Sequence, residues 1–264
     1  MKAVMMTDLE GVAGVVSFAD QSYPDGQYYE AAKRLLTGEI NAAVDGLSAA
    51  GVEEVLVIDG HGPGGVCYED LHPGARLLHG RPLAPAAVRD PLVASYDVAV
   101  MVGQHAMAGV ADANLGHTQN SRAIDYYKLN GRPIGELAQF ALYCGALGVP
   151  LIFVSGDDAG CREAEALVPG ITTAAVKQGL SRSSAISLAM SESRRRIRAA
   201  AECAVRRHQA APLPPLRWPG PYVLEKRFFH TDVADAAAAV PGAERVDSQT
   251  VRLRSADLLE IIYR

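Results

Sequence analysis

The chain opens with MKAVMMTDLEG, residues 1–11, which joins an apolar run to two acidic residues. Residues 2–7 have the pattern of a buried β-strand. Asp8 and Glu10 follow at its end, two positions apart, where side chains of an extended chain point to the same side. Unpaired charges are costly to bury. The position of this pair therefore indicates that a specific partner lies beside it.

Strand and helix patterns alternate along the rest of the chain. We expect strands at 52–59, 97–103, 123–129 and 149–156, and helices at 27–50, 135–148 and 191–209. Repeated β–α alternation is typical of a parallel sheet with helices on both faces. The sequence therefore predicts an α/β fold with a mostly parallel sheet flanked by helices and a smaller C-terminal α+β appendage.

The Pro-rich stretch APLPPLRWPGPY, residues 211–222, predicts a linker between two parts of the chain. We expect an α/β domain over residues 1–210 and a small α+β subdomain over residues 223–264. A final helix is expected at 255–263.

Composition narrows the classes of function. The formal net charge of −5 argues against a nucleic-acid partner, because such proteins show a basic footprint. No apolar run approaches the ~18 residues of a membrane span, so no membrane partner is expected. Four scattered cysteines without a C-x-x-C pair predict reduced thiols and a cytoplasmic location.

Polar residues collect where the predicted strands end. His61 follows the strand at 52–59 in IDGHG, and His105 follows the strand at 97–103 in GQHA. Ligands of open parallel sheets bind beyond the carboxyl ends of the strands. Asp8, Glu10, His61 and His105 are therefore expected to meet at one edge of the sheet.

Two further residues fall nearby in this interpretation. His117 lies in the polar loop NLGHTQNS, and Glu136 opens a helix in NGRPIGEL. Each has an ordinary explanation when taken alone, because a carboxylate in the first helical turn is favoured by the helix dipole and a single histidine is commonly a packing residue. Taken with the strand-end residues, they would add charge to one crevice, which metal ions would neutralise.

Mixed histidine and carboxylate ligands suit zinc, whereas an all-oxygen set would suit magnesium. Five ligands exceed what one open tetrahedral zinc site needs. They match two ions ~3.5–4 Å apart that share a bridging carboxylate and activate water for hydrolysis.

Two alternatives use the same residues differently. A haloacid-dehalogenase-like magnesium phosphatase would use Asp8 as nucleophile and Glu10 for proton transfer, with Asp157 and Asp158 of SGDD as metal ligands. It leaves the histidines without a role. A non-enzymatic flavodoxin-like binding module would cradle a phosphate in GHGPGG, residues 60–65, but a lone glycine-rich loop is weak support.

Seven stretches together resemble the D-aminopeptidase (DppA) family of zinc-dependent peptidases. They run in the family's order and cover the chain from residue 1 to about 190. The stretches are TDLEGVAG (7–14), VLVIDGHG (55–62), VGQHA (102–106), GHT (116–118), NGRPIGEL (130–137), VSGDD (154–158) and TTAAVKQGLSR (172–182).

The resemblance implies a site with two zinc ions per chain, carried by the domain over residues 1–210. Asp8 would bridge the ions. Glu10 and His105 would complete the ligand set of one ion, and His61 and Glu136 would complete that of the other. These would be metal ligands rather than stranded charges.

The resemblance further implies that His117 is the catalytic residue and that the protein removes the N-terminal residue from short peptides of D-amino acids. It also implies a ring-shaped homo-oligomer, a decamer of two stacked pentamers, whose sites face an internal cavity. Gly11, which has no side chain, would leave backbone room beside the acidic pair.

Overall fold

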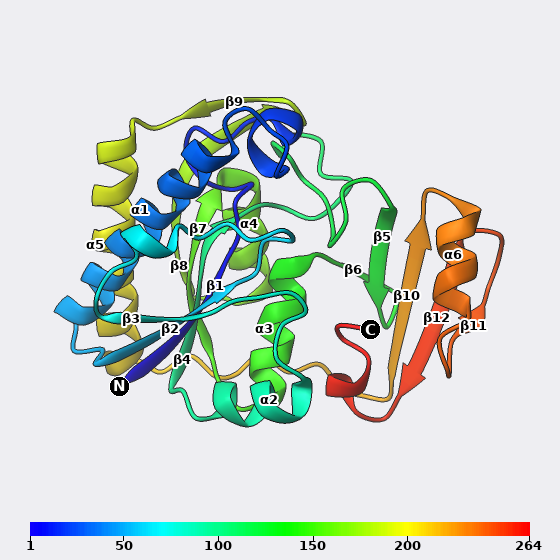
Figure 1. Cartoon of the computed structure of the whole chain (residues 1–264). Coiled ribbons are helices and arrows are strands. Elements are labelled where there is room, and N and C mark those ends of the chain that lie inside the picture. Colours follow the sequence, from blue (N-terminus) through cyan, green and yellow to red (C-terminus); the bar gives the residue numbers. More distant parts are fainter.

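The computed structural model describes residues 1–264 and contains two β-sheets (Figure 1). The larger sheet has seven strands, in the spatial order β3 (Ala75–Leu78), β2 (Glu54–Asp59), β1 (Lys2–Thr7), β4 (Val98–Gln104), β7 (Leu151–Asp157), β8 (Thr172–Ser181) and β9 (Ser184–Ser187). Only β8 and β9 pair antiparallel. The predicted α/β fold with a mostly parallel sheet is confirmed.

The helices flank this sheet and the smaller one. They are α1 (Tyr29–Ala49), α2 (Ala86–Ala94), α3 (Glu136–Ala146), α4 (Asp158–Leu167), α5 (Met190–Ala210) and α6 (Thr231–Ala238). Figure 1 shows α1 and α5 side by side on one face of the large sheet, with α2 and α3 on the other. A π-helical turn (Phe18–Ser22) and two 3-10 turns (Tyr68–Asp70 and Leu258–Glu260) complete the regular structure. No helix combines the length and apolar character needed to cross a membrane.

The central strand β1 is buried on both faces because helices cover both sides of the sheet. Ala3 and Met5 join the apolar cluster beneath α1 and α5, whereas Val4 joins the cluster that includes α3. Successive side chains of a strand point to opposite faces. An unbroken apolar run is therefore what this position requires, and the run at the start of the chain supplies it.

The strand order places the site. β1 lies between β2 and β4, so the connections leaving β1 and β4 run to opposite sides of the sheet. A crevice forms at the carboxyl ends of strands where the order reverses. The loops that follow β1 and β4 start at this crevice, and the loop that follows β2 lies next to it.

The second sheet is antiparallel and draws on two distant parts of the chain. Its order is β11 (Glu244–Arg245), β12 (Thr250–Ser255), β10 (Tyr222–Phe228), β5 (Ile124–Leu129) and β6 (Arg132–Ile134). The sequence predicts this subdomain over residues 223–264 alone, whereas in the structure β5 and β6 also belong to its sheet. The buried residues Leu129 and Tyr127 pair with Leu224 and Lys226 of β10, so β5 joins this sheet rather than the parallel one.

The end of the chain differs from the predicted helix at 255–263. Only the 3-10 turn Leu258–Glu260 forms there, and the tail then packs against α3. Ile262 is buried, and its carbonyl accepts a hydrogen bond from Gln139 Nε2 at 2.7 Å. The prediction of a helix was wrong because this tertiary contact satisfies the backbone of the tail.

Gly11 lies where the ends of β1 and β4 meet, and its N–H donates to Gly103 O at 2.8 Å. A Cβ atom at this position would overlap the carbonyl oxygen of Gln104. We expect Gly11→Ala to lower the free energy of unfolding by about 1–3 kcal/mol, as overpacking typically does. Urea unfolding measures this. Gly62→Ala, whose added methyl would meet nothing within 4 Å, is the matched control, and equal stabilities for the two variants would contradict the close approach.

Candidate metal centre

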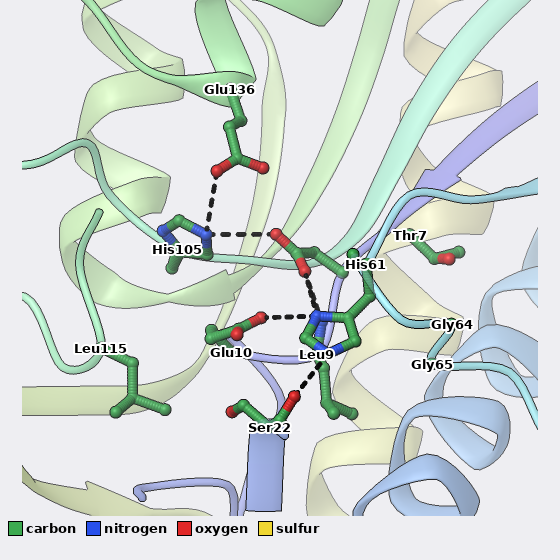
Figure 2. A network of polar contacts seen from close by, with 12 residues as sticks. Thr7, Leu9, Glu10, Ser22, His61, Gly64, Gly65, His105, Leu115 and Glu136 are labelled. Atoms are coloured by element: carbon green, nitrogen blue, oxygen red, sulfur yellow. Dashed lines mark hydrogen bonds and ion pairs between the residues drawn. The ribbon is translucent and has the colours of Figure 1, made fainter. Parts of the chain in front are cut away.

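The turns that follow β1, β2 and β4 bring four polar residues together (Figure 2). Asp8 lies at the centre, with Oδ1 3.2 Å from His61 Nδ1 and Oδ2 3.1 Å from His105 Nε2. Glu10 Oε2 lies 3.1 Å from His61 Nδ1. All four side chains are buried. The convergence expected from the sheet topology is therefore present in the structure.

The remaining two predicted site residues lie on the opposite side of the cluster. Glu136 is the first residue of α3, and its Oε1 lies 3.7 Å from His105 Nε2 and 3.6 Å from His117 Nε2. The His117 ring stacks on the His105 ring with centroids 4.2 Å apart. The resemblance paired Glu136 with His61, whereas the structure places Glu136 beside His105 and His117.

The side chains form two groups of possible metal ligands. Within each group, the ligand atoms lie within 4.8 Å of one another. Asp8, Glu10 and His105 form one, and His105, His117 and Glu136 form the other.

Each of the three imidazoles uses one ring nitrogen to donate to a backbone carbonyl. The pairs are His61 Nε2 to Ser22 O (2.8 Å), His105 Nδ1 to Ala106 O (2.9 Å) and His117 Nδ1 to Leu115 O (3.0 Å). A carbonyl oxygen only accepts, so these nitrogens carry the hydrogen. The other nitrogen of each ring faces the carboxylates, where it can exchange its proton for a metal ion, as in metal-binding histidines.

Two buried atoms of the cluster lack a hydrogen-bond partner, namely His105 Nε2 and Glu10 Oε2. Each approaches a neighbour to 3.1 Å, but neither contact has the alignment of a hydrogen bond. Once its proton is removed, the imidazole nitrogen presents a lone pair that repels a carboxylate oxygen at this distance. A cation between them satisfies both, so the side chains present fit a bound metal ion.

The pKa values of the carboxylates reflect this crowding. Burial raises the pKa of Glu10, and the charge of Asp8 raises it further. Burial, followed by the charge of Asp8, raises the pKa of Glu136 to about 7. Burial also acts to raise the pKa of Asp8, but the contacts with His105 and His61 outweigh it and hold that pKa well below its usual range.

The histidines respond to the same charges. Burial acts to lower the pKa of His61 and His105, but the neighbouring Glu10 and Asp8 raise the two values to about 11 and about 10. Burial and the nearby charge of His105 lower the pKa of His117 to about 3. The carboxylates thus create a strongly negative environment around His61 and His105, which favours bound cations.

Two residues that support the cluster lie outside the set of predicted site residues. Lys177 is buried, and its Nζ donates to the carbonyls of Glu10 and Val15, which holds the loop after β1. Gln119 has a φ of 59°, and its backbone N–H donates to Glu136 Oε1 at 2.7 Å. Both contacts join segments far apart in the sequence, so local patterns do not reveal them.

The acidic pair after β7 does not join the cluster. Asp157 caps α4 by accepting from Gly160 N at 2.7 Å, and Asp158 forms an ion pair with Arg162 at 2.9 Å. These structural roles account for both residues. The phosphatase alternative, which needs them as metal ligands, is not favoured.

The glycine-rich loop after β2 folds around its own carboxylate. Asp59 Oδ1 accepts from Gly65 N at 2.9 Å, and Asp59 Oδ2 accepts from Val66 N at 3.3 Å. A carboxylate therefore already takes up backbone N–H groups that a phosphate would need. The binding-module alternative is not favoured either.

A cavity of about 480 Å³ opens beside the cluster. Its apolar wall comprises Met6, Ile58, Leu83, Met101, Phe140, Tyr143 and Tyr263. Its polar wall comprises Tyr23, Gln119, Asn120, Ser121 and Arg122. Tyr263 is supplied by the C-terminal tail, so the end of the chain forms part of the cavity.

The fold and the site define a class of protein, an α/β protein with a buried carboxylate–imidazole metal centre beside a substrate-sized cavity. A sequence model of the D-aminopeptidase family matches residues 1–263. The chain therefore belongs to the D-aminopeptidase family, as the resemblance implied.

Two relatives support this assignment. A D-aminopeptidase of Bacillus subtilis (strain 168) is 32% identical over 265 residues, which span 98% of this chain and 93% of that protein. A solved structure, described as the Zn-dependent D-aminopeptidase DppA from Bacillus subtilis, a self-compartmentalizing protease, matches with a TM-score of 0.89 and 32% identity. The match covers 99% of this chain and 94% of that one.

Proposed function

We propose that the chain is a zinc-dependent aminopeptidase with two zinc ions, which removes the N-terminal residue from short peptides of D-amino acids. The observation that carries this proposal is the orientation of the three imidazoles. Each ring is fixed by a backbone carbonyl, and each directs its free nitrogen at carboxylate oxygens. Family membership supports the reaction class.

The metal ligands in this proposal are Asp8, Glu10, His61, His105 and Glu136. Asp8 would be shared between the two ions, because its two oxygens face different histidines. Glu10 and Glu136 approach the cluster from opposite sides of Asp8. The Ser22 and Ala106 carbonyls hold the ligand rings in place, and Gln119 N–H holds Glu136.

Bound zinc supplies Lewis acidity, which lowers the pKa of water and polarises a peptide carbonyl. His117 is the catalytic residue of the proposal. Its Nδ1 hydrogen is engaged by Leu115 O, so Nε2 is the atom that accepts a proton and returns it to the leaving amine. The ring is held between His105 and Phe18, which contacts it edge-on with centroids 5.5 Å apart.

The substrate binds with its free amine towards the carboxylates in this proposal. We expect N-acetylation of an alanyl dipeptide to reduce kcat/KM by about 100-fold or more, because an amide nitrogen can neither carry a positive charge nor coordinate a metal ion. Matched D- and L-alanyl peptides, with and without the acetyl group, provide the measurement after zinc loading. Equal turnover of acetylated and free peptides would rule out amine recognition. A preference for L-peptides would contradict the proposed D-specificity but would still support a peptide hydrolase.

We also propose a homo-oligomer, a decamer of two stacked pentamers with the sites facing an internal cavity. The self-compartmentalizing character of the Bacillus subtilis relative supports assembly. Analytical ultracentrifugation tests the stoichiometry. The proposal also includes a cytoplasmic location. It divides the chain into a domain over 1–210, a linker over 211–222 and a subdomain over 223–264 whose sheet is extended by β5 and β6 of the first domain.

A further inference from the structure

Arg122 is the cationic side chain of the cavity wall that forms no ion pair within the chain. The other arginine of the wall, Arg89, lies 3.5 Å from Asp90 Oδ1. Arg122 follows His117 by five residues, on the polar wall with Asn120 and Ser121. A positive charge without an acidic partner therefore faces the space that a substrate would fill.

The loop holds this arginine in place. Its guanidinium stacks over the Tyr23 ring, 4.0 Å from the centroid. The Tyr23 hydroxyl is hydrogen-bonded to Ser121 Oγ at 2.9 Å, and the Arg122 backbone N–H donates to Asn120 Oδ1 at 2.9 Å. Stacking on an aromatic face leaves the N–H groups at the edge of the guanidinium free to donate. Both the backbone and the side chain of Arg122 are therefore positioned before a ligand arrives.

We propose that Arg122 binds the C-terminal carboxylate of the substrate and so makes the enzyme selective for short peptides with a free C-terminus. This inference rests on the proposed peptidase function. An N-terminal amine directed at the metal centre leaves the carboxylate of a short peptide at the other end of the cavity. A planar guanidinium matches a carboxylate with two parallel hydrogen bonds.

A nearby arginine gives the matched control. Arg182 stacks over Phe18 at 4.9 Å from the ring centroid and donates to Ser121 O at 3.4 Å. It carries the same charge beside the same loop but does not line the cavity. Arg182→Gln therefore removes an equal charge without removing the proposed contact.

The test uses the zinc-loaded full chain and two substrates, an alanyl dipeptide of the stereochemistry that is hydrolysed and its C-terminal amide. We expect wild-type enzyme to favour the free acid. Arg122→Gln should lower kcat/KM for the acid about 10–100-fold, mainly through KM, because charge-assisted hydrogen bonds are lost. Turnover of the amide should change less than about threefold. Arg122→Lys should restore part of the preference, and Arg182→Gln should keep it.

Calorimetric binding gives a second readout without turnover. The probe is the dipeptide with its peptide bond reduced to a secondary amine, as the free acid and as the amide. If Arg122→Gln lowers the affinity for the acid and for the amide equally, or leaves the preference for the acid unchanged, the proposed role of Arg122 is wrong. The proposed peptidase function is unaffected by either result. Absence of hydrolysis of every peptide by zinc-loaded wild-type enzyme would instead overturn the proposed function, and this inference with it.

Discussion

Replacing Asp8 with alanine is expected to remove both zinc ions and to reduce peptide hydrolysis below detection. Asp8 Oδ1 lies 3.2 Å from His61 Nδ1, and Asp8 Oδ2 lies 3.1 Å from His105 Nε2. A ligand shared by two ions affects both when it is lost. Glu10→Gln and His61→Ala, by contrast, should mainly weaken one ion. Metal analysis of the purified variants by mass spectrometry measures the stoichiometry.

Folding must be separated from metal binding in this experiment. Asp8 Oδ1 also accepts from Leu9 N at 2.8 Å, and Asp8→Asn keeps an acceptor at that position. We expect the metal-free Asn variant to stay folded but to melt below the wild-type temperature, because the contacts that lower the pKa of Asp8 also stabilise the folded state. Zinc should raise the melting temperature of the wild type and not that of the variant, because ligand binding stabilises only a state that binds it.

Asp25, an exposed carboxylate before α1, gives the control. Asp25→Asn should retain both ions. Full zinc content in Asp8→Ala would show that Asp8 does not bridge.

Replacing His117 with alanine is expected to lower kcat about 10²–10⁴-fold while both zinc ions remain bound. A positioned group that transfers a proton typically contributes a factor of this size. In the proposed centre, five other residues supply the ligands for two ions, and open positions are needed for water and substrate. The measurement is kcat at saturating peptide, so that a change in KM does not mask the effect.

The alternative role for His117 is that of a metal ligand. His117 Nε2 lies 3.6 Å from Glu136 Oε1, and its ring stacks on that of His105, so His117 could itself ligate an ion. Loss of one zinc together with activity would move it into the metal shell. Near-normal turnover with two ions bound would make it a bystander. His117→Gln retains much of the volume against Phe18, and the exposed His79 serves as the control position.

The sequence by itself determined the parallel sheet and much of its reactive edge. Apolar runs buried on both faces predict central parallel strands, and the carboxyl ends of such strands share one edge. This shared edge predicts that Asp8, Glu10, His61 and His105 meet, and they do. The need for a glycine at position 11 follows from the same crowding of strand ends.

Only the tertiary structure decided the other half of the site. β5 pairs with β10, about a hundred residues away, which takes β5 and β6 into the second sheet and sets where α3 begins with Glu136. The orientation of the His61 ring depends on the carbonyl of Ser22 in another turn, and the placement of Arg122 depends on Tyr23. Periodicity and capping reflect interactions between near neighbours in the chain, so they specify strands and helices. Which distant segments then pair is decided by packing of the whole chain, and that packing placed Glu136, His117 and Arg122 around the cavity.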